Sequence, residues 1–299
     1  MSEPITTMSA TTSLSDRLKA LIQYPLPHHL LSKLMYLVTR CQWSPLKNAL
    51  IRFVIKRFDV DMSIAADPEP TNYRHFNEFF TRPLKSDARP IAAEPNAIAC
   101  PVDGAISQLG PIRDGRIFQA KGHDYSLKTL LGGIDHLHER FSDGQFATIY
   151  LSPRDYHRIH MPLSGTLTET VYVPGRLFSV NPATTRAIPG LFARNERLVT
   201  IYETEYGPMA VILVGAIFVA GIETIWSGNY GDKTFRHFEH LSRDNLPDLT
   251  LEKGAEMGRF NMGSTVIVLF GPNQMEWSAA LQADRAVSMG QLLGTTRQG

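Results

Sequence analysis

Three stretches of the chain carry side chains that could do chemistry, and the first is Gly263-Ser264. The serine hydroxyl follows a residue without a side chain and precedes the apolar run 266–270. Because glycine tolerates unusual backbone angles, the chain could bend enough here for the hydroxyl to reach the preceding carbonyl carbon. A self-cleaving serine needs that geometry. Taken alone, however, a serine before a strand is more often a turn residue or a cap.

The other two stretches offer a pair of histidines and a carboxylate. His157 and His160 lie three residues apart within 152–162, where they could bind a metal or act as acid and base. No third ligand lies nearby in the sequence, so the indication of a metal is weak, and two surface histidines explain the pattern as well. Asp103 precedes Gly104, and an Asp-Gly pair is usually only a turn.

Together these residues supply the serine, histidine and aspartate of an activated hydroxyl. Any chain of 299 residues contains those three residue types somewhere. Since the sequence alone does not show that they meet in space, it leaves two classes of protein open. One is a hydrolase-like enzyme, and the other is a module that binds a lipid surface.

The elements that must position these residues are helical at first and extended later. Beyond Ile98 the apolar period changes towards two, with turn signals between the segments, which indicates β-strands. We predict an α+β fold, in which N-terminal amphipathic helices precede a mostly antiparallel, β-rich catalytic domain with a few helices. Strands are predicted at 105–109, 116–120, 145–151, 166–173, 198–205, 209–219 and 265–270, and short helices at 76–80, 125–131 and 134–141. The predicted regions are a disordered tail (1–13), a helical docking region (14–66) and the catalytic domain (67–299).

The helical region is basic and apolar. Residues 14–60 hold eight Lys or Arg against two Asp, a net charge of +6, so the rest of the chain carries −5 of the total of +1. Apolar residues accompany the basic ones throughout, which favours an anionic membrane surface over nucleic acid as the partner. On the third helix we expect Leu46, Leu50, Phe53 and Val54 to share one face. Packing of these helices on the core explains the pattern about as well as docking does.

Composition and length set a few further bounds. Cys41 and Cys100 are the only cysteines and lie far apart in sequence, which gives no disulfide framework and fits a reducing compartment. Residues 1–13 lack the features of a secretion signal. The apolar run 209–222 has 14 residues, short of the roughly 20 that span a bilayer, so a buried strand pair is the better interpretation.

Several longer motifs resemble one family. The chain closely resembles the bacterial membrane-associated phosphatidylserine decarboxylase proenzymes, from about Leu30 to Phe270 and beyond. One departure is at the cleavage motif, typically Leu-Gly-Ser-Thr in that family, where Met262 stands here in place of leucine. Methionine keeps the volume and polarity of leucine, so we expect no effect on cleavage. The matching segments are 76–80, 101–104, 121–127, 150–162, 192–197 and 258–260.

The resemblance implies a chain that makes its own cofactor. Ser264 would attack the Gly263 carbonyl, and elimination would then convert Ser264 into a covalent pyruvoyl group. The products would be a long chain, 1–263, and a short chain of 36 residues, 264–299, which stay associated. By matching position, His160 would be the base for self-cleavage and Asp103 would orient it. An imidazole can take a hydroxyl proton near neutral pH, and a carboxylate fixes its tautomer.

The resemblance also implies a second reaction, the decarboxylation of phosphatidylserine to phosphatidylethanolamine and CO2. The substrate amine would form a Schiff base with the pyruvoyl, which accepts the electrons that CO2 leaves behind. His157 would return a proton to the substrate carbon. Substrate binding is assigned to Lys121, His123 and Arg259, and no metal is expected.

A two-chain lipid stays in the bilayer, so the enzyme must come to it. The basic, apolar region 14–60 is then the docking surface, and we expect a peripheral protein on the cytoplasmic face of a bacterial inner membrane. The sequence leaves a homodimer open. Two rival interpretations remain: a lipid hydrolase in which Ser264 stays a serine, and a lipid-surface protein without catalysis.

Overall fold

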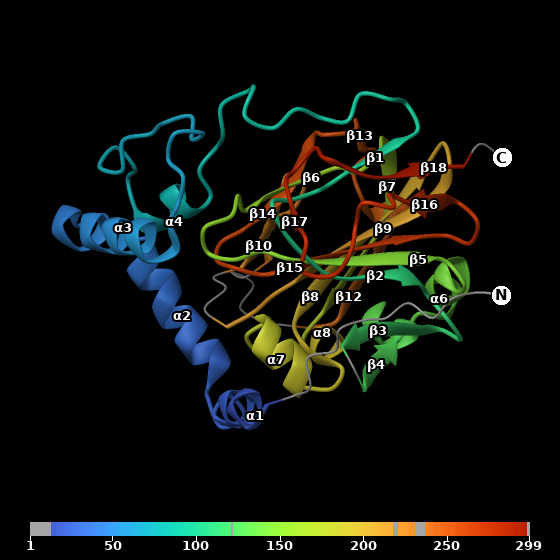
Figure 1. Cartoon of the computed structure of the whole chain (residues 1–299), viewed down its shortest axis with the longest axis horizontal. Helices are drawn as coiled ribbons and strands as arrows, with labels where there is room; N and C mark the ends of the chain where they lie inside the picture. The colour runs from blue at the N-terminus through green and yellow to red at the C-terminus, as the bar shows by residue number, and fades with distance from the viewer. Residues whose placement is uncertain (1–12, 121, 218–220, 231–236, 298–299) are drawn as a thin grey trace.

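The computed structural model describes residues 13–120, 122–217, 221–230 and 237–297. They form an α+β fold in which three helices precede a β-rich body, as predicted (Figure 1). The helices are α1 Leu14–Leu21, α2 His28–Thr39, α3 Ser44–Phe58, α4 Phe76–Phe80, α5 Leu127–Leu130, α6 Asp135–Phe141, α7 Pro182–Ala187 and α8 Leu191–Arg194. The strands are β1 Ala97–Ala99, β2 Gly104–Pro111, β3 Arg116–Ala120, β4 His123–Ser126, β5 Gln145–Tyr150, β6 Arg158–His160, β7 Gly165–Val173, β8 Arg197–Thr204, β9 Gly207–Val214, β10 Ile222–Thr224, β11 Gly228–Asn229, β12 Glu239–Ser242, β13 Thr250–Leu251, β14 Glu256–Phe260, β15 Thr265–Phe270, β16 Met275–Trp277, β17 Ala286–Val287 and β18 Leu292–Thr296.

A nine-stranded antiparallel sheet organises the body. Its order is β12-β7-β8-β9-β15-β5-β2-β17, with β13 also paired to β7. β15 lies between β9 and β5, so both of its edges are hydrogen-bonded, and all six of its residues are buried. A strand that is buried on both faces needs an unbroken apolar sequence, which explains the run 266–270.

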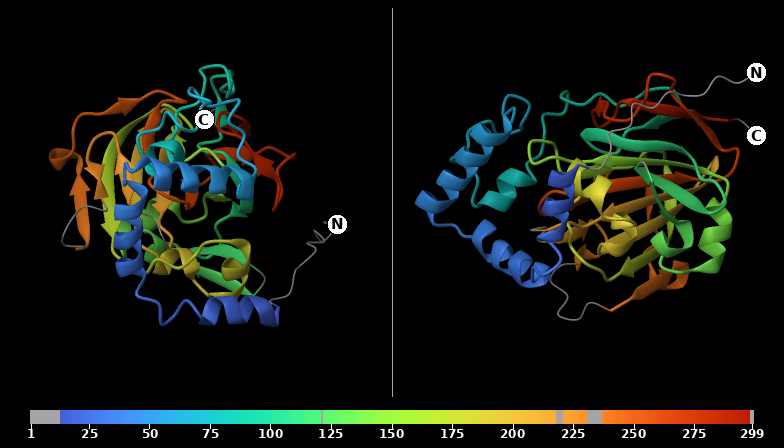
Figure 2. Two further views of the ribbon diagram at one scale, coloured as in Figure 1. Left: turned by 90° about the vertical axis from the view of Figure 1, so that its left-hand side faces the viewer. Right: turned by 60° about the horizontal axis from the view of Figure 1, so that its bottom comes forward.

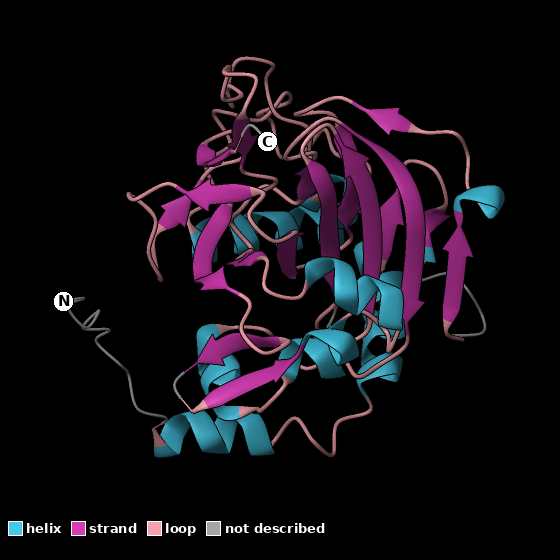
Figure 3. Cartoon of the chain, turned by 90° about the vertical axis from the view of Figure 1, so that its right-hand side faces the viewer, coloured by secondary structure: helices cyan, strands magenta, loops and turns pink. Residues whose placement is uncertain are grey.

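The sheet separates two hydrophobic cores. Val266, Val268 and Phe270 face the first core, which the smaller sheets β11-β10-β14-β6 and β1-β18-β16 close. Ile267 and Leu269 face the second core, to which α5, α6 and α8 contribute. Figure 3 shows helices packed against the long strands of the main sheet. The alternation along β15 follows from the period of two in a strand.

The three N-terminal helices lie along one side of the body (Figures 1 and 2). α1 is fixed to α7 by an ion pair between Asp16 and Arg186 at 3.0 Å, and α3 packs on α4 through a third apolar cluster. No helix in the described part of the chain is long and apolar enough to cross a membrane.

The helix positions are confirmed, and the predicted face of α3 is correct in part. Leu50 and Val54 pack against the buried α3–α4 cluster as predicted, but Ile51 is fully buried and Phe53 is 62% exposed. The inward face therefore centres on Ile51, and the Phe53 side chain points to solvent. Lys47, counted among the docking cations, is buried instead, where its ammonium donates to the Thr71 carbonyl at 2.9 Å.

The main predicted strands are confirmed to within one to three residues, with two corrections. Residues 123–126 form strand β4 and only Leu127–Leu130 are helical, because Ser126 caps a helix that begins after it. The strand that begins near Met209 ends at Val214. The end of its predicted range touches residues 218–219, which lie outside the described residues, as does nearly all of the tail 1–13.

Candidate active site

Ser264 lies in the short link between β14 and β15, at the point where the chain enters the centre of the main sheet. Its side chain is fully buried, and its carbonyl accepts a hydrogen bond from the Leu151 amide at 3.0 Å. Its hydroxyl oxygen has no hydrogen-bond partner among the described residues. A buried polar atom without a partner is unusual enough to require an explanation, and a reactive role is one.

His157 is the imidazole next to Gly263. Its Nδ1 lies 2.8 Å from the Asp155 carbonyl, so this nitrogen carries the proton and Nε2 is left as the base. Nε2 is buried without a partner. A methyl carbon built on Gly263 would lie 3.9 Å from it, which places the imidazole against the Gly263 backbone.

Helix α4 gives His157 its environment. The Phe80 ring lies 4.1 Å from the imidazole, centroid to centroid, and His157 is fully buried. Burial lowers the pKa of His157 from 6.5 to about 3, against the opposing effect of the Asp155 carbonyl, and the nearby Arg82 cation lowers it further. Desolvation penalises the charged ring, so His157 is a neutral base at pH 7.

Further buried polar atoms without a partner belong to α4 and to the link that contains Ser264. Asn77 on α4 donates to the Asn261 side-chain oxygen at 3.0 Å, which joins the helix to the link before Ser264. The remaining Asn77 oxygen and Asn261 nitrogen have no partner among the described residues, and the same holds for the Thr265 hydroxyl. Two of these residues, Asn261 and Thr265, flank the Gly263–Ser264 peptide in sequence, and the third is hydrogen-bonded to Asn261.

His160 is held a short way along β6 by other partners. Its Nε2 lies 3.1 Å from the Tyr156 hydroxyl, and its Nδ1 lies 2.8 Å from the Gly254 carbonyl. Burial lowers its pKa, partly offset by the Gly254 carbonyl. No hydrogen bond between His160 and Ser264 is present among the residues described.

Asp103 is committed to an ion pair. Arg89 donates to its carboxylate through Nε at 2.8 Å and Nη2 at 2.5 Å, and the Met289 amide adds a third bond at 2.8 Å. Its backbone neighbourhood does meet that of His160, whose amide donates to the Pro101 carbonyl at 2.9 Å. The two stretches thus lie side by side, but the described hydrogen bonds do not join the two side chains.

The three residues predicted to bind substrate fall in different places. Arg259 on β14 pairs with Glu223 at 3.4 Å and with Glu256 at 3.7 Å. His123 lies in the β3–β4 hairpin, half exposed. Lys121 lies outside the described residues.

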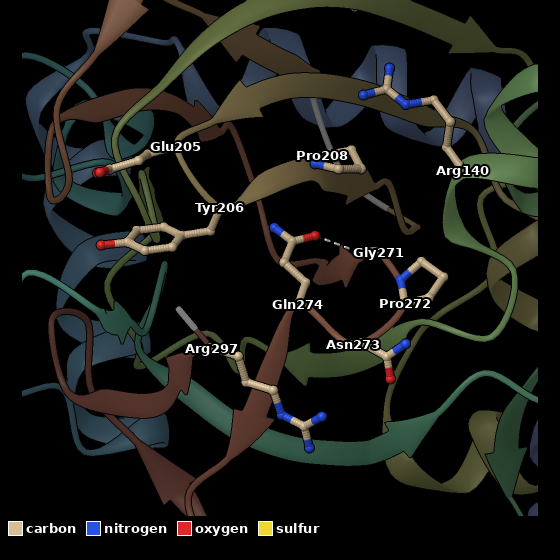
Figure 4. Close-up of a pocket in the computed structure, with 9 residues that line it drawn as sticks. All are labelled: Arg140, Glu205, Tyr206, Pro208, Gly271, Pro272, Asn273, Gln274 and Arg297. Carbon is tan, nitrogen blue, oxygen red and sulfur yellow. Dashed lines mark hydrogen bonds between the residues drawn. The ribbon is translucent and has the colours of Figure 1, made fainter. Parts of the chain in front are cut away.

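A surface pocket of about 590 Å³ lies at the other end of β15, after Phe270. In it Gln274 accepts a hydrogen bond from the Gly271 amide at 2.8 Å, and Arg140 and Arg297 stand at the rim (Figure 4). None of its lining residues belongs to the Ser264 cluster, so the catalytic chemistry is not assigned to this pocket. Ser264 and His157 are closed off from solvent instead.

Comparison with known proteins identifies the group of enzymes that shares these motifs. The family profile described as phosphatidylserine decarboxylase matches residues 76–295, most of the chain. The chain belongs to the phosphatidylserine decarboxylase family. A second profile, described only as PSD, matches residues 18–59. Membership makes the protein an enzyme of the carboxy-lyase class.

Curated relatives support the same assignment along nearly the whole length. The chain is 55% identical to a phosphatidylserine decarboxylase proenzyme of Pseudomonas putida, strain W619, over 95% of this chain and 100% of that protein. It is 56% identical to the proenzyme of Pseudomonas entomophila over the same shares, and 55% identical to that of Pseudomonas aeruginosa, strain LESB58, over 96% and 99%. These decarboxylases are all named as proenzymes, which implies processing of a precursor.

Sequence reasoning missed the residues that support the histidines. Tyr156 and Asp155 stand within the motif that holds both histidines, so their positions were visible but their partners were not. An aromatic-rich segment such as 76–82 predicts core packing, and Phe80 and Arg82 are indeed buried. They lie close to His157 in space although some 75 residues of sequence separate them from it. This proximity depends on where α4 packs, and no local pattern reveals it.

Proposed function

We propose that this decarboxylase matures by cutting itself between Gly263 and Ser264, and then converts phosphatidylserine to phosphatidylethanolamine and CO2. One observation carries the proposal: the Ser264 hydroxyl and His157 Nε2 are both fully buried, both unpartnered among the described residues, and both next to Gly263. A serine that served only as a turn or cap would use its hydroxyl in a hydrogen bond.

In the first step an ester replaces the peptide bond between Gly263 and Ser264, and one proton moves from the serine hydroxyl to the new amine. Ser264 Oγ attacks the carbonyl carbon of Gly263 while an imidazole takes the hydroxyl proton, and the C–N bond breaks to leave an ester and an amine. Loss of the Ser264 α-proton expels the Gly263 carboxylate. The dehydroalanine that remains tautomerises, and water releases ammonia from it to leave a pyruvoyl group at position 264.

The short chain is expected to stay in place after the cut. Residues 264–299 contain β15, β16, β17 and β18. Of these, β15, β17 and β18 pair with strands of the long chain, and β16 pairs with β18. β15 alone has six residue pairs with β5 and six with β9. These hydrogen bonds and two apolar cores hold the products together without the peptide bond.

Two imidazoles are candidates for the base in self-cleavage. We retain His160, oriented by Asp103, because their sequence positions match the family and their backbones lie side by side. To act, the His160 ring must leave the Tyr156 hydroxyl that it contacts in this structure. His157 competes for the role, since its free Nε2 already faces Gly263.

In decarboxylation the pyruvoyl group supplies an electron sink for the bond to CO2. We assign the return of a proton to the substrate carbon to His157. A ring with a pKa of about 3 holds no second proton at pH 7, so the role requires a change in its surroundings. The phosphate and carboxylate of the lipid supply this change, because a nearby anion raises the pKa of an imidazole. Arg259, His123 and Lys121 are proposed to bind those anions.

The N-terminal helices are proposed to dock on an anionic bilayer. Leu18, Leu21, Leu34, Leu37 and Phe53 are each more than half exposed. Such a concentration of large apolar side chains at one end of a protein marks an interaction surface. Exposed basic residues accompany them on the same helices, namely Arg17, Lys19, Lys33, Arg52, Lys56 and Arg57. We place this surface on the cytoplasmic face of a bacterial inner membrane.

Intact mass measurement tests the proposal. The active protein should consist of two chains divided between Gly263 and Ser264, and the short chain should be lighter by one ammonia than a serine-initiated peptide. Ser264→Ala should remain a single chain without decarboxylase activity. A single full-length chain from an active preparation would contradict the proposal and favour a hydrolase.

Two histidine variants assign the base. If His160 takes the hydroxyl proton, His160→Ala accumulates as precursor, while His157→Ala is cleaved but does not release CO2 from phosphatidylserine vesicles. If His157→Ala also remains a single chain, His157 serves in both steps. Normal cleavage of His160→Ala would exclude it as the base.

A further inference from the structure

Three side chains far from Ser264 converge on one point of the surface. His136 comes from α6, Glu169 from β7 and His240 from β12. His136 Nε2 lies 3.1 and 3.0 Å from the two Glu169 carboxylate oxygens, and His240 Nε2 lies 2.7 Å from one of them. β12 is separated from β15 by β7, β8 and β9, so this cluster is independent of the catalytic residues.

The sheet register explains how two of the three meet. His240 is paired with Val171, and Glu169 with Ser242. His240 and Glu169 are therefore diagonal neighbours on the same face, within reach of long side chains. α6 brings His136 over that face, because Leu137 and Phe141 of the same helix are buried in the second core together with Val171.

The donor atoms have the chemistry and spacing of a metal site. The cluster offers two imidazole nitrogens and one carboxylate oxygen, all within 4.8 Å of one another. Tetrahedral zinc binds such ligands at about 2.0–2.2 Å, which sets the donors about 3.3 Å apart. The two separations from the shared Glu169 oxygen are 3.0 and 2.7 Å, so the donors need to move apart by only about 0.3 to 0.6 Å to bind the metal. The His136 side chain is 52% exposed, which leaves a side open for water as a fourth ligand.

The charge of Glu169 provides a second argument. Its side chain is only 12% exposed, and its ion-pair partners among the described residues are these two histidines. A largely desolvated carboxylate is costly unless it is paired with an opposite charge or coordinates a metal. A divalent cation between the three groups would supply that charge.

We propose that His136, Glu169 and His240 bind a divalent transition metal of the zinc class, which ties α6 to the edge strands β7 and β12. Two nitrogens and one oxygen suit zinc, nickel or copper, whereas magnesium and calcium prefer oxygen ligands. Binding displaces the Nε2 protons of the two imidazoles to solvent, so no oxidant or reductant is involved. The competing explanation is a carboxylate that two histidines bind by hydrogen bonds alone.

Titration with metal distinguishes the two explanations. Purified mature enzyme is stripped with a chelator, dialysed and titrated with ZnCl₂ by calorimetry, and with CoCl₂ by visible absorption. The expected result is one tight site for each pair of long and short chains, a tetrahedral Co²⁺ spectrum and a higher melting temperature with zinc. Absence of a saturable site in the stripped enzyme would overturn the proposal.

Variants tie the binding to these residues. His136→Ala, His240→Ala and the conservative Glu169→Gln should each weaken zinc binding at least about tenfold. They should also lose the cobalt spectrum while keeping decarboxylase activity. His138→Ala is the matched control, because it removes an imidazole of the same helix whose hydrogen-bond partner among the described residues is Ser142, outside the cluster. If one-to-one zinc binding persists unchanged in the three cluster variants, the metal binds elsewhere and the proposal is wrong. Circular dichroism of each variant shows that it is folded.

Discussion

The neutral state of His157 makes a prediction about stability in acid. The buried ring has a pKa of about 3, against 6.5 for the free side chain. Between these two values the unfolded chain binds a proton that the folded chain does not. The free energy of unfolding therefore falls as the pH drops below 6.5, and rises again with pH up to that value. This contribution is absent when residue 157 cannot titrate.

The size of the effect follows from the pKa difference. Between pH 7.5 and pH 5.0 the imidazole of the unfolded chain becomes protonated. Below pH 6.5 the free energy of unfolding falls by about 1.4 kcal/mol per pH unit, which amounts to about 2 kcal/mol over the 1.5 units down to pH 5.0. His157→Gln should remove that part of the acid destabilisation. Other buried histidines with lowered pKa values, such as His28 and His160, remain in both proteins and cancel in the comparison.

Urea unfolding at pH 7.5 and pH 5.0 measures the difference, with both proteins in the Ser264→Ala background so that each is a single chain. The parent should lose about 2 kcal/mol more than the His157→Gln protein between the two pH values. His123→Gln, which removes a half-exposed imidazole of the β3–β4 hairpin, is the control and should behave like the parent. Equal losses in parent and His157→Gln would refute the reasoning, because His157 would then be charged in the folded protein at pH 5.

Two further predictions concern the cleavage link and the helices. Gly263→Ala should fold normally, since the added methyl group meets only ordinary contacts at 3.7 and 3.9 Å, but it should slow self-cleavage about 100-fold, because the methyl group occupies space between His157 Nε2 and the scissile carbonyl and restricts the backbone there. A gel time course of precursor and products measures the rate, and unchanged cleavage would contradict the prediction. Gly258→Ala is the comparison: its methyl group would lie 2.4 Å from the Glu223 carbonyl, so this variant should be unstable. The double change Leu34→Gln and Leu37→Gln should weaken binding to vesicles with anionic lipid by about 3 kcal/mol, or roughly 100-fold, at about 1.5 kcal/mol for each leucine. Phe118→Gln on β3, which alters an equally exposed apolar residue away from the helices, should have no effect on vesicle sedimentation, and a similar loss in both proteins would count against the docking surface.

The sequence predicts the fold well wherever one local rule decides the structure. β15 is visible because a strand buried on both faces needs six consecutive apolar or small residues. α3 is visible because it has Pro45 in its first turn and apolar residues at helical spacing after it. The burial of Ile51 rather than Phe53 is not visible, because it depends on where α4 lies against α3.

The site divides in the same way. The motifs place Ser264 and both histidines in the correct segments, because each segment has a recognisable composition. They do not show which imidazole faces Gly263, since that depends on the pairing of β6 with β14, where the register shifts between Glu256 and Gly258. The structure shows no left-handed backbone at this link, because Gly263 is not among the described glycines with positive φ.

The proposed metal site cannot be predicted from local sequence. Its histidines lie 33 residues before Glu169 and 71 residues after it, with no common motif. Only the antiparallel pairing of β7 with β12 and the docking of α6 bring them together. A search for ligands at fixed spacing finds His157 and His160 instead, whose hydrogen bonds in the structure go to protein groups.

The burial of Ser264 links the two reactions. Neither Ser264 nor His157 has any exposed surface, so no lipid headgroup reaches them in the intact chain. β15 fixes the start of the short chain from both edges, and that side of the cut has no freedom to open. The other side is different: Met262 packs against both the second core and the α3–α4 cluster, and it is attached to β15 only through the bond that is cut. Cleavage turns Met262 and Gly263 into a chain end beneath α4. We therefore expect the substrate to enter from the side of α3 and α4, next to the helices that carry the exposed apolar residues.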